Sequence, residues 1–184
     1  MGDYNCDGNL DMFLGDNFRF TQPETGNWQT GYGSVLLGDG KGGFKVPEPH
    51  ATGIYMATDN RGVVPADLNG DGQLDLVVSM SDAAAQVALR QKAESGGTGL
   101  EVTLHGKAPN SAGIGAKLAL KLSSGQTVYR TVQAGEGYLS SYAGPVHFGV
   151  PAGTTASEVD VTWPDGTSSK STELATGRVT ITGK

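Results

Sequence analysis

Two stretches of nine residues share the pattern Asp-x-Asn-x-Asp-Gly-x-Leu-Asp, and each runs directly into an apolar segment. The first covers residues 3–11 and the second covers residues 67–75, so the pattern recurs at an offset of 64 residues. Together they hold six of the 19 acidic residues of the chain. Three carboxylates so close together repel one another unless a cation neutralises them. These loops therefore constrain the fold more than any other feature of the sequence.

The oxygen-rich composition of the loops is typical of a calcium site. Calcium takes six to eight oxygen ligands at about 2.3–2.6 Å, and side chains at loop positions 1, 3, 5 and 9 with the carbonyl of position 7 can supply most of them. Water can fill the remaining position. The Gly at position 6 permits the backbone to turn sharply around the ion. We predict two calcium ions, held by Asp3, Asn5, Asp7, Asn9 and Asp11 in the first loop and by Asp67, Asn69, Asp71, Gln73 and Asp75 in the second.

Other metals and other loop types fit less well. No His or Cys stands at a ligand position, which disfavours zinc, and magnesium gives up its water reluctantly. An EF-hand needs a bidentate Glu at position 12, where this chain has Leu14 and Val78. A metal-free Asp/Asn/Gly turn stays open as an alternative, although agreement of two copies at every ligand position favours metal.

The chain divides into two parts with different sequence texture. Short apolar bursts separated by Gly, Asp and Asn extend to about residue 92, and a Gly-rich stretch follows at residues 94–99. Beyond it, apolar and polar residues alternate as in antiparallel strands with one solvated face. We therefore predict an all-β chain: residues 1–93 form calcium-binding repeats that resemble propeller blades, and residues 94–184 form a small antiparallel β-sandwich.

Several strands can be assigned in advance. Residues 34–44 read as a strand, a Gly-rich turn and a second strand. Residues 83–94 have helix propensity, but the repeat needs a hairpin partner there, so a strand is favoured. In the second half the alternating apolar residues are Leu100, Val102, Leu104, Leu118, Leu120, Leu122, Val159, Val161, Trp163, Val179 and Ile181; Glu101, Thr103 and His105 are expected on a solvated face.

Charge and composition exclude several function classes. The formal net charge is −6, and no cluster of Lys and Arg appears, so we expect no nucleic-acid partner and no binding to anionic membranes. No apolar run is long enough to span a membrane. The single cysteine, Cys6, cannot form an internal disulfide, so an extracellular form of this chain would need another stiffening element, such as metal.

The residues that could support catalysis are better explained as structural. Ser111, Ser140 and Ser141 lack a nucleophile-elbow context, and the acidic pairs repeat with a Gly-turn signature that catalytic carboxylates do not need. Cys6 lies between two ligand positions and is expected to point away from the metal. We expect no catalytic residues and no enzyme. The candidate general bases, all expected to be structural, are His50, His105 and His147; the rings of Tyr138, Tyr142 and Trp163 are expected in the core, with sugar contact as the alternative.

Both loops, with the apolar run after each, resemble the VCBS/FG-GAP repeat, the blade unit of calcium-bearing β-propellers. The second half resembles the ASPIC/UnbV domain at residues 110–117, 135–141, 147–150 and 161–166. The repeat followed by this domain is the arrangement of the cartilage acidic protein family and its bacterial relatives. The resemblance implies an extracellular, calcium-binding protein with a role in adhesion or matrix contacts, and only the loop ligands carry over from the family.

Two repeats cannot close a propeller, since repeat architectures generally need three or more units. We therefore expect this chain to be the C-terminal part of a longer one, with an export signal upstream and a location that is extracellular, at the cell surface or periplasmic. The leading hypothesis is a non-catalytic adhesion or scaffold module that binds a protein or glycan. The alternatives are a carbohydrate-binding accessory region of a polysaccharide-active enzyme and a self-assembling surface or filament protein, because unpaired strand edges favour self-association.

Overall fold

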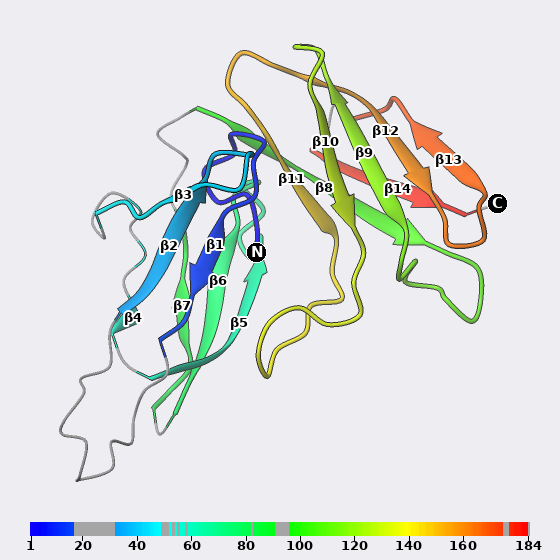
Figure 1. Ribbon diagram of the computed structural model, residues 1–184. Helices are drawn as coiled ribbons and strands as arrows, with labels where there is room; N and C mark the ends of the chain where they lie inside the picture. The colour runs from blue at the N-terminus through cyan, green and yellow to red at the C-terminus, as the bar shows by residue number, and fades with distance from the viewer. Residues whose placement is uncertain are drawn as a thin grey trace, which may run out of the picture.

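A computed structural model describes residues 1–16, 32–48, 52, 54, 56–57, 59–81, 83–90, 96–174 and 177–183. In this part of the chain every regular element is a β-strand, as predicted. The strands form two lobes (Figure 1): β1 to β7 make the N-terminal lobe and β8 to β14 make the C-terminal lobe.

The N-terminal lobe consists of two antiparallel sheets: residues 3–11 lead into the first strand of one sheet, and residues 67–75 connect the first two strands of the other. The first sheet has the order β1–β2–β3, with β4 also paired to β2, and the second has the order β5–β6–β7. The strands are β1 (Met12–Leu14), β2 (Tyr32–Gly38), β3 (Phe44–Lys45), β4 (Met56–Ala57), β5 (Asn60–Ala66), β6 (Asp75–Met80) and β7 (Gln86–Ala88).

Two predictions for this lobe are confirmed. The strand, turn and strand expected over residues 34–44 is the β2–β3 hairpin. The segment that could have been a helix forms β7, which pairs with β6 as the repeat required. Tertiary pairing overrides helix propensity here because β6 needs a partner for its second edge. The end of that segment, residues 91–94, lies outside the described residues.

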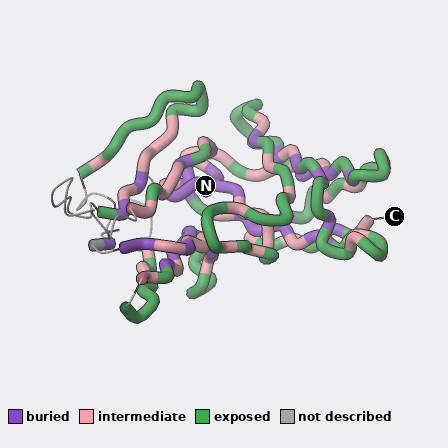
Figure 2. Tube along the Cα trace, turned by 60° about the horizontal axis from the view of Figure 1, so that its bottom comes forward, coloured by how far each residue is buried: buried purple, intermediate pink, exposed green. Residues whose placement is uncertain are grey.

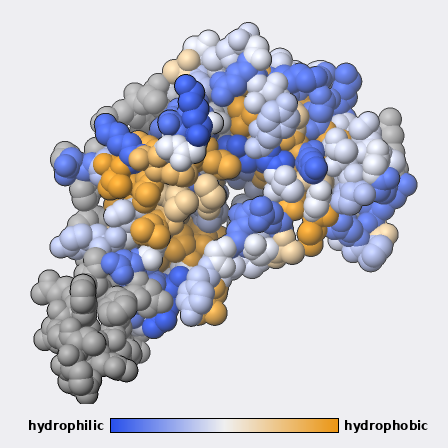
Figure 3. All heavy atoms as spheres, in the orientation of Figure 1, coloured by the Kyte–Doolittle hydropathy of each residue, from blue (hydrophilic) through white to orange (hydrophobic). Residues whose placement is uncertain are grey.

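The core of the N-terminal lobe joins the two sheets. Its buried residues come from both sheets and from the loops: Tyr4, Val35, Ile54, Met56, Leu74, Leu76 and Val78. Hydrophobic residues gather in the middle of this lobe on the face in Figure 3, with hydrophilic residues around them. Neighbouring blades of a β-propeller also pack face to face over a shared apolar core. The sheets of the described residues do not close into a ring.

The C-terminal lobe is a β-sandwich. One sheet has the order β10–β9–β12–β13 and the other has the order β11–β8–β14. Its strands are β8 (Thr98–His105), β9 (Lys117–Leu122), β10 (Thr127–Thr131), β11 (Val146–Val150), β12 (Ala156–Thr162), β13 (Ser168–Ser171) and β14 (Arg178–Thr182).

The predicted alternation of the C-terminal lobe is confirmed. The alternating residues named from the sequence are buried in its core, except for Val179, which is partly buried and packs against it. Figure 2 shows the resulting change between buried and exposed segments along these strands. The sandwich is antiparallel, as predicted, except that β14 runs parallel to β8. The chain crosses from β13 in one sheet to β14 in the other, and such a crossover allows parallel pairing.

The predicted domain boundary between residues 93 and 94 falls within residues 91–95, which are outside the described part, and stays a prediction. No helix in the described ranges has the length and apolar character needed to cross a bilayer.

The centre of the sandwich provides a stability test. Leu120 is fully buried on β9, between β10 and β12. Leu120→Ala should lower the free energy of unfolding by about 2–5 kcal/mol, because it removes buried methyl groups and leaves a cavity. Tyr129→Ala, a control at an exposed position on the neighbouring strand β10, should change it by less than about 0.5 kcal/mol. Urea unfolding measures both, and equal effects would contradict the assigned core.

Candidate calcium loops

Loop A, residues 3–11, curls its side-chain oxygens onto its own backbone. The two carboxylate oxygens of Asp3 accept hydrogen bonds from the amides of Asp7 (3.1 Å) and Gly8 (2.9 Å). The side-chain oxygen of Asn5 accepts from the same Asp7 amide at 3.1 Å. Asp7 in turn accepts from the amide of Asn9 at 2.8 Å. Positions 1, 3 and 5 are therefore brought together, as the spacing predicted.

Loop B, residues 67–75, repeats this pattern. Asp67 accepts from the amides of Asp71 (3.2 Å) and Gly72 (3.0 Å). Asn69 accepts from the Asp71 amide at 3.0 Å, and Asp71 accepts from the amide of Gln73 at 2.8 Å. The two loops therefore have one conformation, and the sequence repeat is also a structural repeat.

The backbone turns where the sequence predicted. The glycine at position 6 has a positive φ in both loops, 89° at Gly8 and 84° at Gly72. Position 4 also has a positive φ, 79° at Gly70 but 54° at Cys6. A side chain other than glycine is strained in this region, so Cys6 adopts its conformation because the surrounding loop imposes it.

Cys6, at position 4 of loop A, contacts loop B. Its buried thiol donates to the side-chain oxygen of Gln73 in loop B, with a sulfur-to-oxygen distance of 3.5 Å. Burial, together with the nearby carboxylate of Asp3, raises the pKa of the thiol to about 12. The thiol is therefore protonated at neutral pH, and its observed contact is structural.

The aspartate at position 9 has a role that the sequence did not reveal. Asp11 accepts from the amide of Tyr4 within loop A (2.8 Å) and from the amide of Gly38 at the end of β2 (2.9 Å). Asp75 accepts in the same way from the amides of Leu68 (2.9 Å) and Arg90 (2.7 Å). Each of these aspartates therefore ties its loop to the far end of the hairpin partner strand.

The loops fit a hard cation by the chemistry and burial of their donors. Asp3 and Asp11 are buried. Burial raises the pKa of Asp3 to about 7, although Arg130 opposes the shift, and burial also raises the pKa of Asp11. A buried carboxylate is more stable as an anion when a positive charge lies beside it. Calcium would supply that charge.

The carboxylates do not form a metal site by themselves. Among the residues that the structure describes, no group of three or more His, Cys, Asp and Glu side chains is arranged to hold a metal ion. The amide oxygens of position 3 and the carbonyl of position 7 would have to complete the ligand set, as the pattern predicted. The ligand assignments and the two calcium ions therefore stay predictions.

Both loops pack against the outer face of sheet β11–β8–β14. Gly99 on β8 and Gly149 on β11 are paired neighbours on that face. A Cβ at Gly99 would overlap the carbonyl oxygen of Gly72 in loop B, and one at Gly149 would overlap the carboxylate of Asp3 in loop A. The two glycines therefore let the loops approach the sheet closely.

His147 makes a polar contact with loop B on this face. Its Nε2 lies 3.0 Å from the carbonyl oxygen of Gly72, which assigns the donating proton to Nε2. Burial lowers the pKa of His147, so the ring is neutral at pH 7. The contact that the structure shows for this histidine joins the two lobes. His105 is exposed on its strand, as predicted, and His50 lies outside the described residues.

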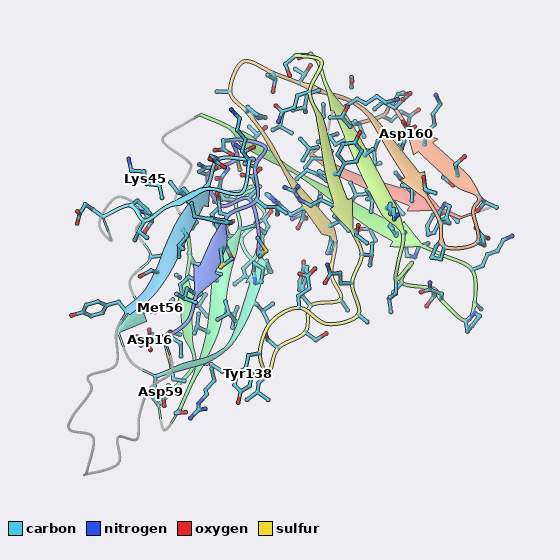
Figure 4. All side chains as sticks on the ribbon, viewed as in Figure 1. Asp16, Lys45, Met56, Asp59, Tyr138 and Asp160 are labelled. Carbon is cyan, nitrogen blue, oxygen red and sulfur yellow. The ribbon has the colours of Figure 1, made fainter. Side chains whose placement is uncertain are left out.

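Two predictions for side-chain environment are wrong. Glu101 is buried, although the alternation placed it on a solvated face, because loop B covers that end of β8 and Arg178 pairs with its carboxylate at 3.0 Å. Tyr138 is exposed, although its ring was expected in the core; it lies on the long loop between β10 and β11 (Figure 4). The alternation of apolar and polar residues shows which side chains share a face of a strand. It does not show whether another part of the molecule covers that face.

Of the remaining candidates, Trp163, Ser140 and Ser141 make contacts within the fold. Trp163 is buried in the sandwich core, as predicted, and its indole nitrogen donates to Ser169 at 3.0 Å. The hydroxyls of Ser140 and Ser141 donate to backbone carbonyls of their own loop, and Ser111 is exposed. The ring of Tyr142 is partly buried.

Sequence comparisons divide the chain as its motifs do. Residues 3–78 match the family described as FG-GAP-like repeat, and residues 106–183 match the family described as ASPIC and UnbV. Cartilage acidic protein 1 of Mus musculus is 33% identical over 117 residues, that of Xenopus tropicalis is 36% identical over 112, and that of Homo sapiens is 32% identical over 117.

These alignments cover 62%, 59% and 62% of this chain, respectively, and 18%, 17% and 18% of the relatives. The chain therefore spans less than a fifth of the length of the curated relatives it matches. The two matched regions account for most of the chain and occur in the predicted order. The chain therefore contains an FG-GAP-like repeat followed by an ASPIC and UnbV domain.

Proposed function

We propose that this chain is a calcium-stabilised, non-catalytic module of an extracellular protein, and that it presents a β framework to a protein or glycan partner at a cell surface or in a matrix. The observation that carries the proposal is the duplicated loop: two acidic loops with one hydrogen-bonding pattern lie next to each other between the lobes.

The loops contact each other directly, so metal in one would affect the other. The Cys6 thiol reaches Gln73, and the guanidinium of Arg90, which follows β7, donates to the carbonyl oxygen of Tyr4 in loop A. Calcium would be held in each loop by the predicted ligands at positions 1, 3, 5, 7 and 9. When bound, the ion neutralises carboxylates that burial otherwise makes costly to ionise.

The consequence for the framework follows from position 9. Because Asp11 and Asp75 already tie each loop to its neighbouring strand, an ion that orders a loop also orders the hairpin beside it. Calcium is thus proposed to take the stiffening role that disulfides have in many secreted proteins, which suits a chain with a single cysteine.

The extracellular and non-catalytic parts of the proposal rest on different support. The relatives are named as cartilage acidic proteins, a name that refers to a tissue rich in matrix. The histidines and serines that the structure describes serve structural contacts or lie exposed. A carbohydrate-binding role would need a surface other than Trp163, so the adhesion or scaffold role is the one that we propose.

Metal removal tests the proposal most simply. Adding calcium to about ten times its Kd should stabilise the chain by about 1.4 kcal/mol per site, because the ion binds only the folded loops. With a Kd on the order of 10⁻⁴–10⁻³ M, as in other extracellular modules, millimolar calcium suffices. The melting temperature by differential scanning calorimetry should therefore rise with calcium and fall with chelator. A temperature that neither changes would contradict bound calcium.

Substitutions at position 5 test the ligand assignment. Asp7→Asn and Asp71→Asn each remove a charged oxygen donor, so each should abolish one of two calcium-binding events in an isothermal titration. Asp160→Asn is the matched control. It removes the same charge from β12, in the sheet β10–β9–β12–β13, far from both loops (Figure 4). Two sites retained in both loop variants, or one lost in the control, would refute the assignment.

A further inference from the structure

The first aspartate of each loop lies beside an arginine of the C-terminal lobe. Asp3 of loop A faces Arg130 on β10, and Asp67 of loop B faces Arg178 on β14. β10 and β14 belong to opposite sheets of the sandwich. Two unrelated strands therefore place the same kind of cation at the same position of two related loops.

Arg130 lies on the face of β10 that points toward the core. It is two residues from the buried Val128, so both side chains share that face, and its own side chain is 12% exposed. Its guanidinium lies 5.4 Å from the centre of the Phe148 ring. One terminal nitrogen, Nη1, donates to the carbonyl of Tyr129 at 2.9 Å. The other, Nη2, is buried without a hydrogen bond and lies 3.9 Å from the Asp3 carboxylate.

Arg178 bridges the two lobes at the surface. Its Nη2 lies 3.5 Å from the carboxylate of Asp67, and its Nε lies 3.0 Å from the carboxylate of Glu101 on β8. The arginine side chain is 61% exposed, but that of Asp67 is only 1% exposed. The cation therefore covers a buried carboxylate that would otherwise have only backbone amides as partners.

We infer that Arg130 and Arg178 act as stand-in cations for the two loops: they hold the C-terminal lobe on loops that carry no metal, and they weaken calcium binding to the same loops. The carboxylates at position 1 are shared between the two roles. A positive side chain close to a divalent ion repels it, so each arginine lowers the calcium affinity of its loop. By reciprocity, bound calcium lowers the contribution of that arginine to docking.

This inference rests on the proposed calcium binding and adds that the ASPIC and UnbV lobe regulates it. The glycine platform at Gly99 and Gly149 positions the lobe by shape in either state, since it carries no charge. The arginines add a contribution that depends on metal. Docking would then persist at low calcium, and the calcium affinity would be set in part by the C-terminal lobe.

The test compares calcium titrations of full chains that differ at Arg178, which is exposed enough to be replaced without loss of folding. Arg178→Gln should bind calcium about three- to tenfold more tightly at one site, because a nearby positive charge is removed and salt screens part of the effect. Arg178→Lys keeps the charge and should bind as the wild type does. Arg130→Gln should show the same direction at the other site.

Arg61→Gln is the matched control for charge. Arg61 pairs with Asp59 at 3.5 Å, at the opposite end of β5 from loop B. Asp59 lies at the far end of the N-terminal lobe in Figure 4. The loss of one positive charge there should leave both calcium affinities unchanged.

Hydrogen exchange of the loop B amides gives a readout of docking. In chelator, Arg178→Gln should expose the amides of Gly70 and Gly72, which donate to Asp67, and raise their exchange rates several-fold over the wild type. In saturating calcium the difference should shrink.

The outcomes separate the inference from the function on which it rests. Calcium binding that is unchanged or weaker in both glutamine variants would overturn the stand-in role while leaving the calcium sites in place. No calcium binding by the wild type would overturn the proposed function, and the coupling with it. Tighter binding in Arg61→Gln would show a general charge effect and would also overturn the inference.

Discussion

The structure depends on the burial of aspartate carboxylates. Asp3, Asp11 and Asp75 are buried, and burial of a carboxylate is costly unless hydrogen bonds and positive charge compensate. The chain supplies backbone amides to each of them and one arginine near Asp3. Both the N-terminal sheets and the C-terminal lobe are arranged around that compensation.

The loops connect parts of the molecule that have separate cores. Position 9 ties each loop to the hairpin beside it, the Cys6–Gln73 contact ties one loop to the other, and Gly99 and Gly149 let both approach the sandwich. The apolar clusters of the two lobes stabilise each lobe by itself. The acidic loops are the polar layer between them, so their charge state affects how the lobes hold together.

The sequence was most informative where a local pattern has one physical solution. Strict alternation in Leu118, Leu120 and Leu122 can bury only one face of a strand, and that face is the core. The repeated loop spacing likewise predicted that positions 1, 3 and 5 converge and that position 6 turns, since only glycine adopts that φ without strain. The family motifs then divided the chain as the comparisons do.

Contacts between distant segments could not be predicted, because each partner carries no local signal. The alternation of its own strand places Glu101 on a solvated face, but its side chain is buried beside loop B and Arg178. The amides of Gly38 and Arg90, which bind the position 9 aspartates, are set by strand register. Arg130 is a partial exception, because a charged residue at a core-facing position of a strand requires a partner. Its partner Asp3 could not be identified, because it is distant in sequence.

A crystal structure of this chain grown in millimolar calcium, with anomalous diffraction data, tests the central claim most directly. The account predicts two anomalous peaks, one inside residues 3–11 and one inside residues 67–75, each surrounded by oxygen atoms at about 2.3–2.6 Å. Loops that keep their present hydrogen bonds with no peak in either would contradict it.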